Sequence, residues 1–203
     1  MKTRLAKAHP AKTSKRSKQP AKKALPAGAK LISSKLAYTG RNFTVYKDTI
    51  VEPGGYRAVR DVIRHNGSVV VLAVDDAGRV LMVRQYRHAA GQFLLELPAG
   101  HIDAGEAPLA AAKRELMEET GYSARRWRPL VKYYASPGFL GETMQIYLAE
   151  GIREGTAHPE EDEKIEVQRV PLRELLAKIE TGKIHDGKTV IGALLYAAKY
   201  SPA

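Results

Sequence analysis

The sequence contains no cysteine, which excludes disulfide bonds and metal sites built on thiolates. It also lacks any apolar run of the roughly 18 residues that a membrane-spanning helix needs, and no secretory hydrophobic segment follows the N-terminus. These absences are typical of a soluble protein in a reducing compartment. We therefore expect a cytoplasmic protein without membrane contact.

Acidic side chains are absent from residues 1–35, which carry 11 Lys and Arg. Since the whole chain has 33 basic and 22 acidic residues, residues 36–203 hold 22 of each and are neutral. Residues 1–30 also have few large apolar side chains, so they cannot bury enough surface to offset the entropy of ordering them. We predict a disordered basic tail over 1–35 and one globular domain over 36–203. A solvated extension explains the tail better than a contact with nucleic acid.

Short β-branched runs after the tail, separated by turn residues, predict strands. The runs are Phe43–Val51, Tyr56–Ile63, Ser68–Val74, Val80–Tyr86, Phe93–Leu97, Arg128–Tyr134, Thr143–Ala149 and Ile165–Val170. Asn66-Gly67 and the turn Asp75–Gly78 indicate antiparallel hairpins. Helices are predicted over Pro108–Thr120, from Pro171 onward and over Val190–Tyr200. This order predicts an α+β domain in which a mixed sheet packs between helices, an α/β/α sandwich.

Three glutamates share one face of the helix predicted over Pro108–Thr120. Glu115, Glu118 and Glu119 stand at i, i+3 and i+4, which at about 100° per residue places them together. Like charges at this spacing repel by about 0.2–0.5 kcal/mol per pair, and a hard divalent cation relieves the repulsion because it selects oxygen ligands. Taken alone, the three residues fit a solvated acidic face equally well. The adjacent apolar stripe consists of Leu109, Ala112 and Leu116.

The full segment Gly100–Tyr122 resembles the Nudix box. That family's pattern is a glycine, a glutamate six positions later, and then Arg-Glu-apolar-x-Glu-Glu-x-Gly-apolar. The matching residues are Gly100, Glu106, Arg114, Glu115, Leu116, Glu118, Glu119 and Gly121, with Tyr122 at the last apolar position. The resemblance implies the Nudix fold and a metal-dependent hydrolase of nucleoside diphosphates linked to another group.

The resemblance also implies a role for each position of the box. Glu115 and Glu119 would be the principal ligands of Mg²⁺ or Mn²⁺, together with the carbonyl of Ala99, and Glu118 would assist catalysis. Glu106 and Arg114 would form a structural pair that holds the loop to the helix, and Gly100 and Gly121 would be further structural positions of the box.

Outside the box, residues 40–200 resemble the ADP-ribose pyrophosphatases. The segments that carry this likeness are Val83–Arg87 followed by Glu96–Gly100, Ser136–Phe139 with Pro137 fifteen residues beyond Tyr122, and the acid-rich stretch Glu160–Val167. The implied reaction converts ADP-ribose and water to AMP and ribose 5-phosphate. The substrate contacts that the resemblance implies are Arg87, Glu96, Ser136, Pro137, Gly138 and Glu142.

The acid-rich stretch would supply the general base, since a metal-polarised water needs a nearby carboxylate to accept its proton. Glu161 is the candidate base and Glu163 an extra metal ligand, although a loop so rich in acids leaves the assignment open between them. The resemblance further implies a homodimer formed through strands at about 38–65, with Arg60, ahead of Arg57 or Arg64, serving the partner's pocket. Aromatic residues available to stack adenine are Tyr38, Phe43, Tyr46 and Tyr56.

Other interpretations of the function stay open. The substrate could be GDP-mannose, a dinucleoside polyphosphate or the 5′ end of RNA, and a non-catalytic nucleotide sensor would share the fold. A sensor predicts lost catalytic glutamates, and none is missing from the box.

Two further patterns carry less weight. Gly182–Thr189 matches the letters of a phosphate-binding loop, but an amphipathic helix precedes it where such a loop needs a buried strand, and 14 residues follow. We interpret Asp186 as the cap of the last helix instead. The histidines, among them His65, His88 and His101, are scattered along the sequence and predict no metal cluster.

Overall fold

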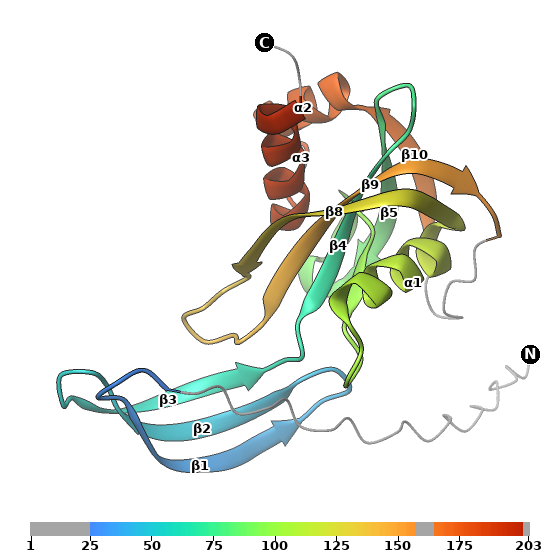
Figure 1. Ribbon diagram of the computed structural model, residues 1–203. Helices are drawn as coiled ribbons and strands as arrows, with labels where there is room; N and C mark the ends of the chain where they lie inside the picture. The colour runs from blue at the N-terminus through green and yellow to red at the C-terminus, as the bar shows by residue number, and fades with distance from the viewer. Residues whose placement is uncertain (1–24, 157–164, 201–203) are drawn as a thin grey trace, which may run out of the picture.

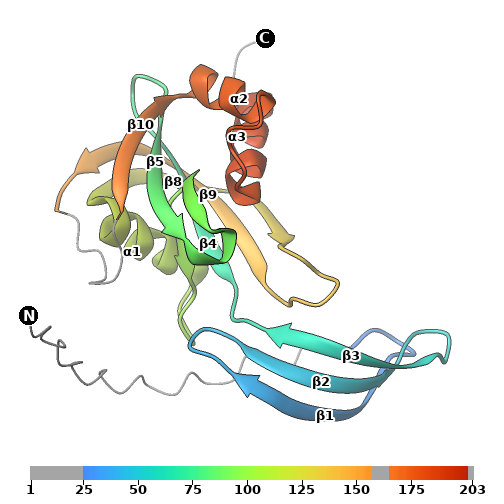
Figure 2. The same cartoon turned by 180° about the vertical axis from the view of Figure 1, so that it is seen from behind.

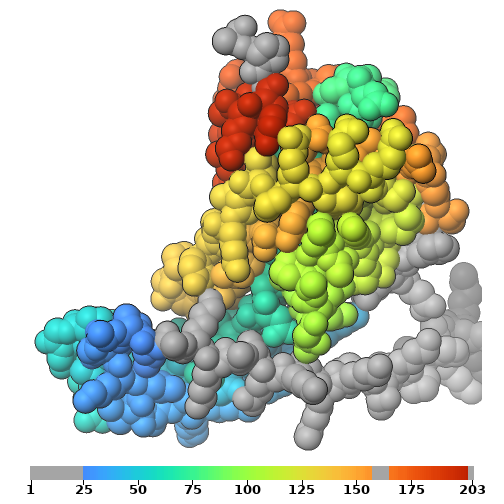
Figure 3. All heavy atoms as spheres, viewed as in Figure 1, coloured from blue at the N-terminus to red at the C-terminus, as the bar shows by residue number. Residues whose placement is uncertain are grey.

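The computed structural model describes residues 25–156 and 165–200, which form two sheets and three α-helices (Figure 1). The N-terminal sheet is antiparallel, in the order β1 (Lys30–Thr39), β2 (Thr44–Val51) and β3 (Arg57–Arg64). It stands out from the rest of the molecule as a separate layer (Figure 3).

The central sheet contains seven strands in the order β10-β5-β4-β9-β8, with β6 paired to β5 and β7 paired to β4. These strands are β4 (Ser68–Val74), β5 (Arg79–Arg87), β6 (Gln92–Glu96), β7 (Ala99–His101), β8 (Tyr122–Tyr134), β9 (Thr143–Glu154) and β10 (Glu166–Pro171). The sheet is mixed because β4 and β9 are parallel while the other pairs are antiparallel. A 3₁₀ turn at His88–Ala90 joins β5 to β6.

Helices cover both faces of the central sheet (Figures 1 and 2). Helix α1 (Pro108–Thr120) lies on one face, and α2 (Leu172–Glu180) and α3 (Gly187–Tyr200) lie on the other. The predicted α/β/α sandwich and Nudix-like order of elements are therefore confirmed.

Strand β4 is buried along its whole length and divides its side chains between the two faces. Val70, Leu72 and Val74 pack with residues of α2 and α3. Val69, Val71 and Ala73 pack with Ala111, Ala112 and Leu116 of α1. Leu109, expected in this stripe, is exposed because it lies in the first turn, ahead of the part of α1 that packs on the sheet. Full burial stabilises each large apolar side chain by about 1.5–3 kcal/mol.

One of the two predicted hairpins is confirmed and the other is wrong. The turn Asp75–Gly78 joins β4 to β5, and Gly78 has φ 72°, a conformation that glycine adopts at little cost. Asn66-Gly67 instead links β3 to β4, which lie in different sheets. The local turn signal cannot decide this, since the continuously apolar β4 needs partners on both edges inside the core, whereas β3 is largely exposed.

The boundary of the basic tail also needs correction. Strand β1 begins at Lys30, so residues 30–35 belong to the N-terminal sheet, and residues 1–24 lie outside the described residues. Composition misses β1 because nearly all its side chains are exposed. The strand forms through backbone pairing with β2, from Lys30 opposite Val51 to Thr39 opposite Thr44. Within the described ranges, no helix is long and apolar enough to cross a membrane.

Candidate active site on the glutamate-rich helix

The loop before α1 is held beside the helix because β4 pairs with two different strands, β5 and β7, along the same edge. Near its end, β4 pairs with β5 at Val74 and Val80, and at its beginning it pairs with β7, with Val70 opposite Ala99. The carbonyl of Pro98 accepts a hydrogen bond of 2.8 Å from the amide of Val71. The segment from Pro98 to Gly100 is thereby held at the sheet edge beside α1.

Two glutamates of α1 meet this loop. The carboxylate of Glu119, a residue only 5% exposed, accepts a hydrogen bond of 3.1 Å from the amide of Ala99. Glu115 lies against Gly100, where an added Cβ would stand 2.0 Å from the Cδ of that glutamate. Residue 100 therefore has no room for a side chain, and the two carboxylates are gathered at the backbone of residues 99–100.

Arg114 joins the loop to the helix. Its guanidinium donates hydrogen bonds of 3.0 Å to each carboxylate oxygen of Glu106 and one of 3.0 Å to the carbonyl of His101. It also donates to Glu115 at 2.7 Å and to Glu118 at 2.9 Å. The hydrogen bonds from Arg114 lower the pKa of Glu106, and those of Glu106 raise the pKa of Arg114. The structure thus brings together the predicted pair Glu106 and Arg114.

The three glutamates of the acidic face differ in exposure. The side chain of Glu118 is 44% exposed and that of Glu115 is 12% exposed, while Glu119 is buried. Since buried carboxylates so close together are costly unless a cation or a donor compensates them, Glu115 and Glu119 form the inner part of the site. Glu118 lies at its outer edge.

A buried ion network lies beside the loop. Glu96, whose side chain is 1% exposed, accepts two hydrogen bonds of 2.8 Å from Arg87, at Oε1 and Oε2. Its Oε2 also accepts a hydrogen bond from the Nζ of Lys188 in α3. Burial would raise the pKa of Glu96, but the hydrogen bonds of Arg87 and the charge of Lys188 outweigh it and hold that pKa below its ordinary value. Both oxygens of Glu96 are thus engaged, and the residue anchors Arg87.

Comparison with protein families identifies the family to which this loop and helix belong. The model of the NUDIX domain matches residues 64–190, which include the loop, α1 and all seven strands of the central sheet. The chain belongs to the Nudix family. The loop and helix described above are its Nudix box, as the sequence pattern predicted.

Curated relatives cover most of the Nudix chain. The ADP-ribose pyrophosphatase of Bacillus subtilis is 36% identical over 84% of this chain and 91% of its own length. The ADP-ribose pyrophosphatase of Mycobacterium tuberculosis is 41% identical over 80% of each chain. The GDP-mannose pyrophosphatase of Citrobacter koseri is 39% identical over 64% of this chain and 77% of its own. A solved structure of an ADP compounds hydrolase, 24% identical, shares the fold with a TM-score of 0.73 over 87% of this chain and 96% of that one.

The segment that contains Pro137 pairs with the end of β3. The turn from Ser136 to Leu140 connects to β3, since the carbonyl of Phe139 accepts the amide of Ile63 at 2.8 Å and the carbonyl of Ile63 accepts the amide of Gly141 at 2.9 Å. Pro137 and Gly138 are exposed in this turn. The turn therefore joins the N-terminal sheet to the Nudix core.

Glu142 lies in a group that the sequence did not predict. Its Oε1 accepts a hydrogen bond of 2.6 Å from Ser68 and lies 3.6 Å from the Nδ1 of His65, and the rings of His65 and His101 are 4.8 Å apart. The prediction that the histidines form no cluster is wrong for His65 and His101. His65 lies in the linker between the sheets and His101 in β7, so the two meet only in the folded chain. Burial lowers the pKa of His101, and the proximity of His65 adds to the effect.

A cavity of about 410 Å³ opens beside this group. It lies between the N-terminal sheet and the Nudix core and is lined by Arg41, Asn42, Phe43, Ile63, His65, His101, Leu140 and Glu142. Phe43 is an aromatic residue expected near adenine, while Tyr46 is buried in its sheet beneath the guanidinium of Arg64, 3.7 Å from the ring centre. The cavity offers both apolar and hydrogen-bonding walls close to the Nudix box.

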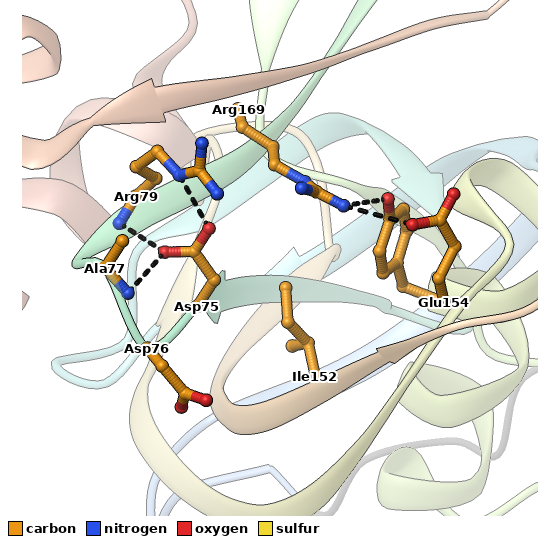
Figure 4. A pocket seen from close by; sticks show the side chains of 8 residues that line it. Asp75, Asp76, Ala77, Arg79, Ile152, Glu154 and Arg169 are labelled. Atoms are coloured by element: carbon orange, nitrogen blue, oxygen red, sulfur yellow. Dashed lines mark hydrogen bonds and ion pairs between the residues drawn. The ribbon is translucent and has the colours of Figure 1, made fainter.

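A second hollow, of about 370 Å³, surrounds the turn between β4 and β5 (Figure 4). Its charged side chains bind one another: Asp75 accepts from Arg79 at 2.7 Å, and Arg169 pairs with Tyr122 and with Glu154 at 3.3 Å. This turn follows the end of β4 opposite to the end that pairs with β7. Tyr122, the last residue of the Nudix box, lines the hollow, but the loop at Ala99 and Gly100 does not.

Of the remaining site residues predicted from the sequence, the structure describes Arg60 alone. Among the described residues, Arg60 pairs with Glu52 at 2.5 Å inside the N-terminal sheet rather than with the acidic helix of its own chain. Glu161 and Glu163 lie outside the described residues. Lys188 and Thr189 belong to the buried network. Both lie in the segment Gly182–Thr189, whose resemblance to a phosphate-binding loop was rejected. Their only sequence signal was two polar residues near the start of an otherwise apolar helix.

Proposed function

We propose that this protein hydrolyses the pyrophosphate of ADP-ribose to AMP and ribose 5-phosphate. The observation that carries the proposal is the convergence of Glu115 and Glu119 on the backbone of Ala99 and Gly100. The two relatives that are 36% and 41% identical over at least 80% of this chain are both ADP-ribose pyrophosphatases. The relationship supports the substrate, and the geometry supports the chemistry.

The residues present fit a hard divalent cation, and we assign Mg²⁺, with Mn²⁺ as a substitute. Carboxylate and carbonyl oxygens are the ligands that these ions prefer. Glu115, Glu119 and the carbonyl of Ala99 would hold the ion, with Glu163 as a further ligand. When bound, the cation would neutralise charge on the diphosphate and make an attacking water more acidic.

The chain's own side chains would supply the rest of the chemistry. Arg87, fixed by Glu96, would bind a phosphate oxygen of the substrate. Glu161 would accept the proton of the attacking water, with Glu118 assisting at the outer edge of the box. The diphosphate would lie between these groups, and the remaining contacts would come from Ser136, Pro137, Gly138 and Glu142.

A homodimer completes the proposal. The N-terminal sheet exposes a group of large apolar side chains, Ile32, Leu36, Tyr38, Tyr56 and Val59, and exposed apolar surface of this kind favours association. Pairing of two such sheets would bring Arg60 towards the partner's site. Light scattering coupled to size exclusion should give twice the chain mass, and Val59→Glu should shift the mass towards the monomer. A monomeric wild type at micromolar concentration would contradict this part of the proposal.

The decisive experiment measures products from ADP-ribose, GDP-mannose, a dinucleoside polyphosphate and a capped RNA in the presence of Mg²⁺. We expect AMP and ribose 5-phosphate from ADP-ribose with the highest kcat/KM, and no turnover by Glu119→Gln. Preference for GDP-mannose would replace the substrate but keep the chemistry, and the relative from Citrobacter koseri makes it the second candidate. Binding of a nucleotide without turnover of any compound would point to a sensor.

A further inference from the structure

Lys188 is the most deeply placed lysine of the described chain, with a side chain 9% exposed. Its Nζ binds Glu96 and also Oδ1 of Asp186 at 2.8 Å. A lysine loses its hydration when it is buried, so it persists there only with charged partners. The two carboxylates provide those partners, and Glu96 belongs to a strand 92 positions earlier in the sequence.

The neighbouring residue holds α3 in place. Oγ1 of Thr189, which is fully buried, accepts the amide of Leu97 at 2.8 Å and donates to Oδ2 of Asp186 at 2.5 Å. Asp186 also accepts the amide of Thr189 at 3.0 Å, so it caps α3 as expected. The start of α3 is therefore locked to the segment that leads into the Nudix box.

The four charged groups of this network balance one another. Asp186 and Glu96 carry negative charge, while Lys188 and Arg87 carry positive charge. Lys188 shares Oε2 of Glu96 with Arg87, so the carboxylate does not neutralise the guanidinium alone. The side chain of Arg87 is 39% exposed, and its pKa is raised mainly by the hydrogen bonds to Glu96, with a smaller contribution from the charge of Glu119. Arg87 thus lies within electrostatic reach of the acidic helix.

We infer that Lys188 is a positioning residue that sets the positive charge offered by Arg87 to the anionic substrate. This inference rests on the proposed function, because it assigns Arg87 to a phosphate of the diphosphate. Lys188 acts through Glu96 and does not touch the substrate. Removing its charge leaves Glu96 paired with Arg87 alone and adds one net negative charge beside the diphosphate.

Two substitutions in the network test the inference because they change the charge in opposite directions. Lys188→Met should raise KM for ADP-ribose about tenfold, the order expected for one unpaired charge several Å from the diphosphate, and should change kcat less than about threefold. Asp186→Asn keeps a good helix cap and removes a negative charge, so it should leave KM unchanged or lower it. Leu176→Ala, in the apolar cluster beneath α2 and α3, should lower Tm and leave KM unchanged.

A structural role of Lys188 would give a different pattern. If α3 docking were the only effect, Lys188→Met and Asp186→Asn would move KM in the same direction, and Leu176→Ala would follow them in proportion to its loss of Tm. A shift of KM in the same direction in both network variants overturns the inference, and so does a KM of Leu176→Ala that follows its loss of Tm. A KM of Lys188→Met within twofold of the wild type overturns it as well. A wild-type protein inactive on ADP-ribose would instead overturn the proposed function.

If the wild-type protein is inactive on ADP-ribose, an NMR measurement without turnover still tests the coupling between Lys188 and Arg87. The Nε–H resonance of Arg87, assigned by its loss in Arg87→Lys, reports on the bond to Glu96. Lys188→Met should shift this resonance in the full-length protein, while Leu176→Ala should leave it in place. An unmoved resonance in Lys188→Met would overturn the coupling between the two residues.

Discussion

Gly100 and Glu115 are in such close contact that any side chain at position 100 would overlap the carboxylate of the glutamate, with Cβ 2.0 Å from its Cδ. The glycine precedes α1, and the glutamate lies two turns into the helix. Their contact fixes the distance between the loop backbone and the glutamate-bearing face of α1.

Substitution of Gly100 by alanine should therefore displace Glu115. A shift of about 1 Å in a catalytic constellation costs on the order of a hundredfold in rate, and we expect Gly100→Ala to lower kcat/KM by about that factor. Gly187→Ala is the matched control, because nothing lies within 4 Å of its Cβ. It should keep activity and raise stability by about 0.4–1 kcal/mol. Equal activity of Gly100→Ala and wild type would contradict the proposed contact.

Glu119 should account for most of the metal-linked stability. A ligand at about 100 times its Kd stabilises the folded state by about 2.7 kcal/mol, so Mg²⁺ should raise the Tm of the wild type. Glu119→Gln should lose most of that rise, while the more exposed Glu118→Gln should keep more of it. Thermal unfolding with Mg²⁺ and with EDTA makes the comparison. A full Mg²⁺ response in Glu119→Gln would place the cation elsewhere.

Arg114 should not tolerate lysine. Its guanidinium binds Glu106, Glu115, Glu118 and the carbonyl of His101 at once, a geometry that a single ammonium cannot reproduce. We expect Arg114→Lys to lower the free energy of unfolding by about 2 kcal/mol. Arg126→Lys, which alters an exposed ion pair of 3.8 Å with Glu150, should cost less than about 0.5 kcal/mol. Similar urea midpoints for the two variants would argue against Arg114 as the link between loop and helix.

Glu106 should make stability depend on acidity. The hydrogen bonds of Arg114 lower its pKa below the ordinary value of 4.5. Its contribution is therefore present above the pKa of the unfolded chain and is lost as pH falls through the lower pKa of the folded state. The stability difference between wild type and Glu106→Gln should shrink as pH falls below about 5. Urea unfolding at several pH values tests this, and a constant difference down to pH 3 would refute it.

The sequence was sufficient where a local pattern specifies the structure. Helix α1 begins at Pro108 and ends at Thr120 as predicted, since proline favours the first turn and Gly121, at φ 75°, ends the helix in the left-handed conformation. The β-branched run Ser68–Val74 predicted the strand β4, and the spacing of the Nudix box predicted the shared face of the glutamates. In each case the cause lies within a few residues of its effect.

Other features depended on residues far apart in the chain. Pairing of β1 with β2 decided where the domain begins, and packing of the two sheets decided that His65, His101 and Glu142 meet. The roles of Glu161 and Glu163 remain predictions from the sequence, since both lie outside the described residues.

By itself, the sequence determined the family, the acidic helix and the pairing of Arg114 with Glu106. Only the tertiary structure decided that Lys188 and Arg87 share Glu96, and that the last helix is thereby joined to the site. The physical reason is burial: a lysine in an apolar helix looks like an exposed charge until the fold brings a carboxylate such as Glu96 beside it from a distant strand. Periodicity and spacing describe neighbours along the chain, whereas charge compensation in the interior depends on neighbours in space.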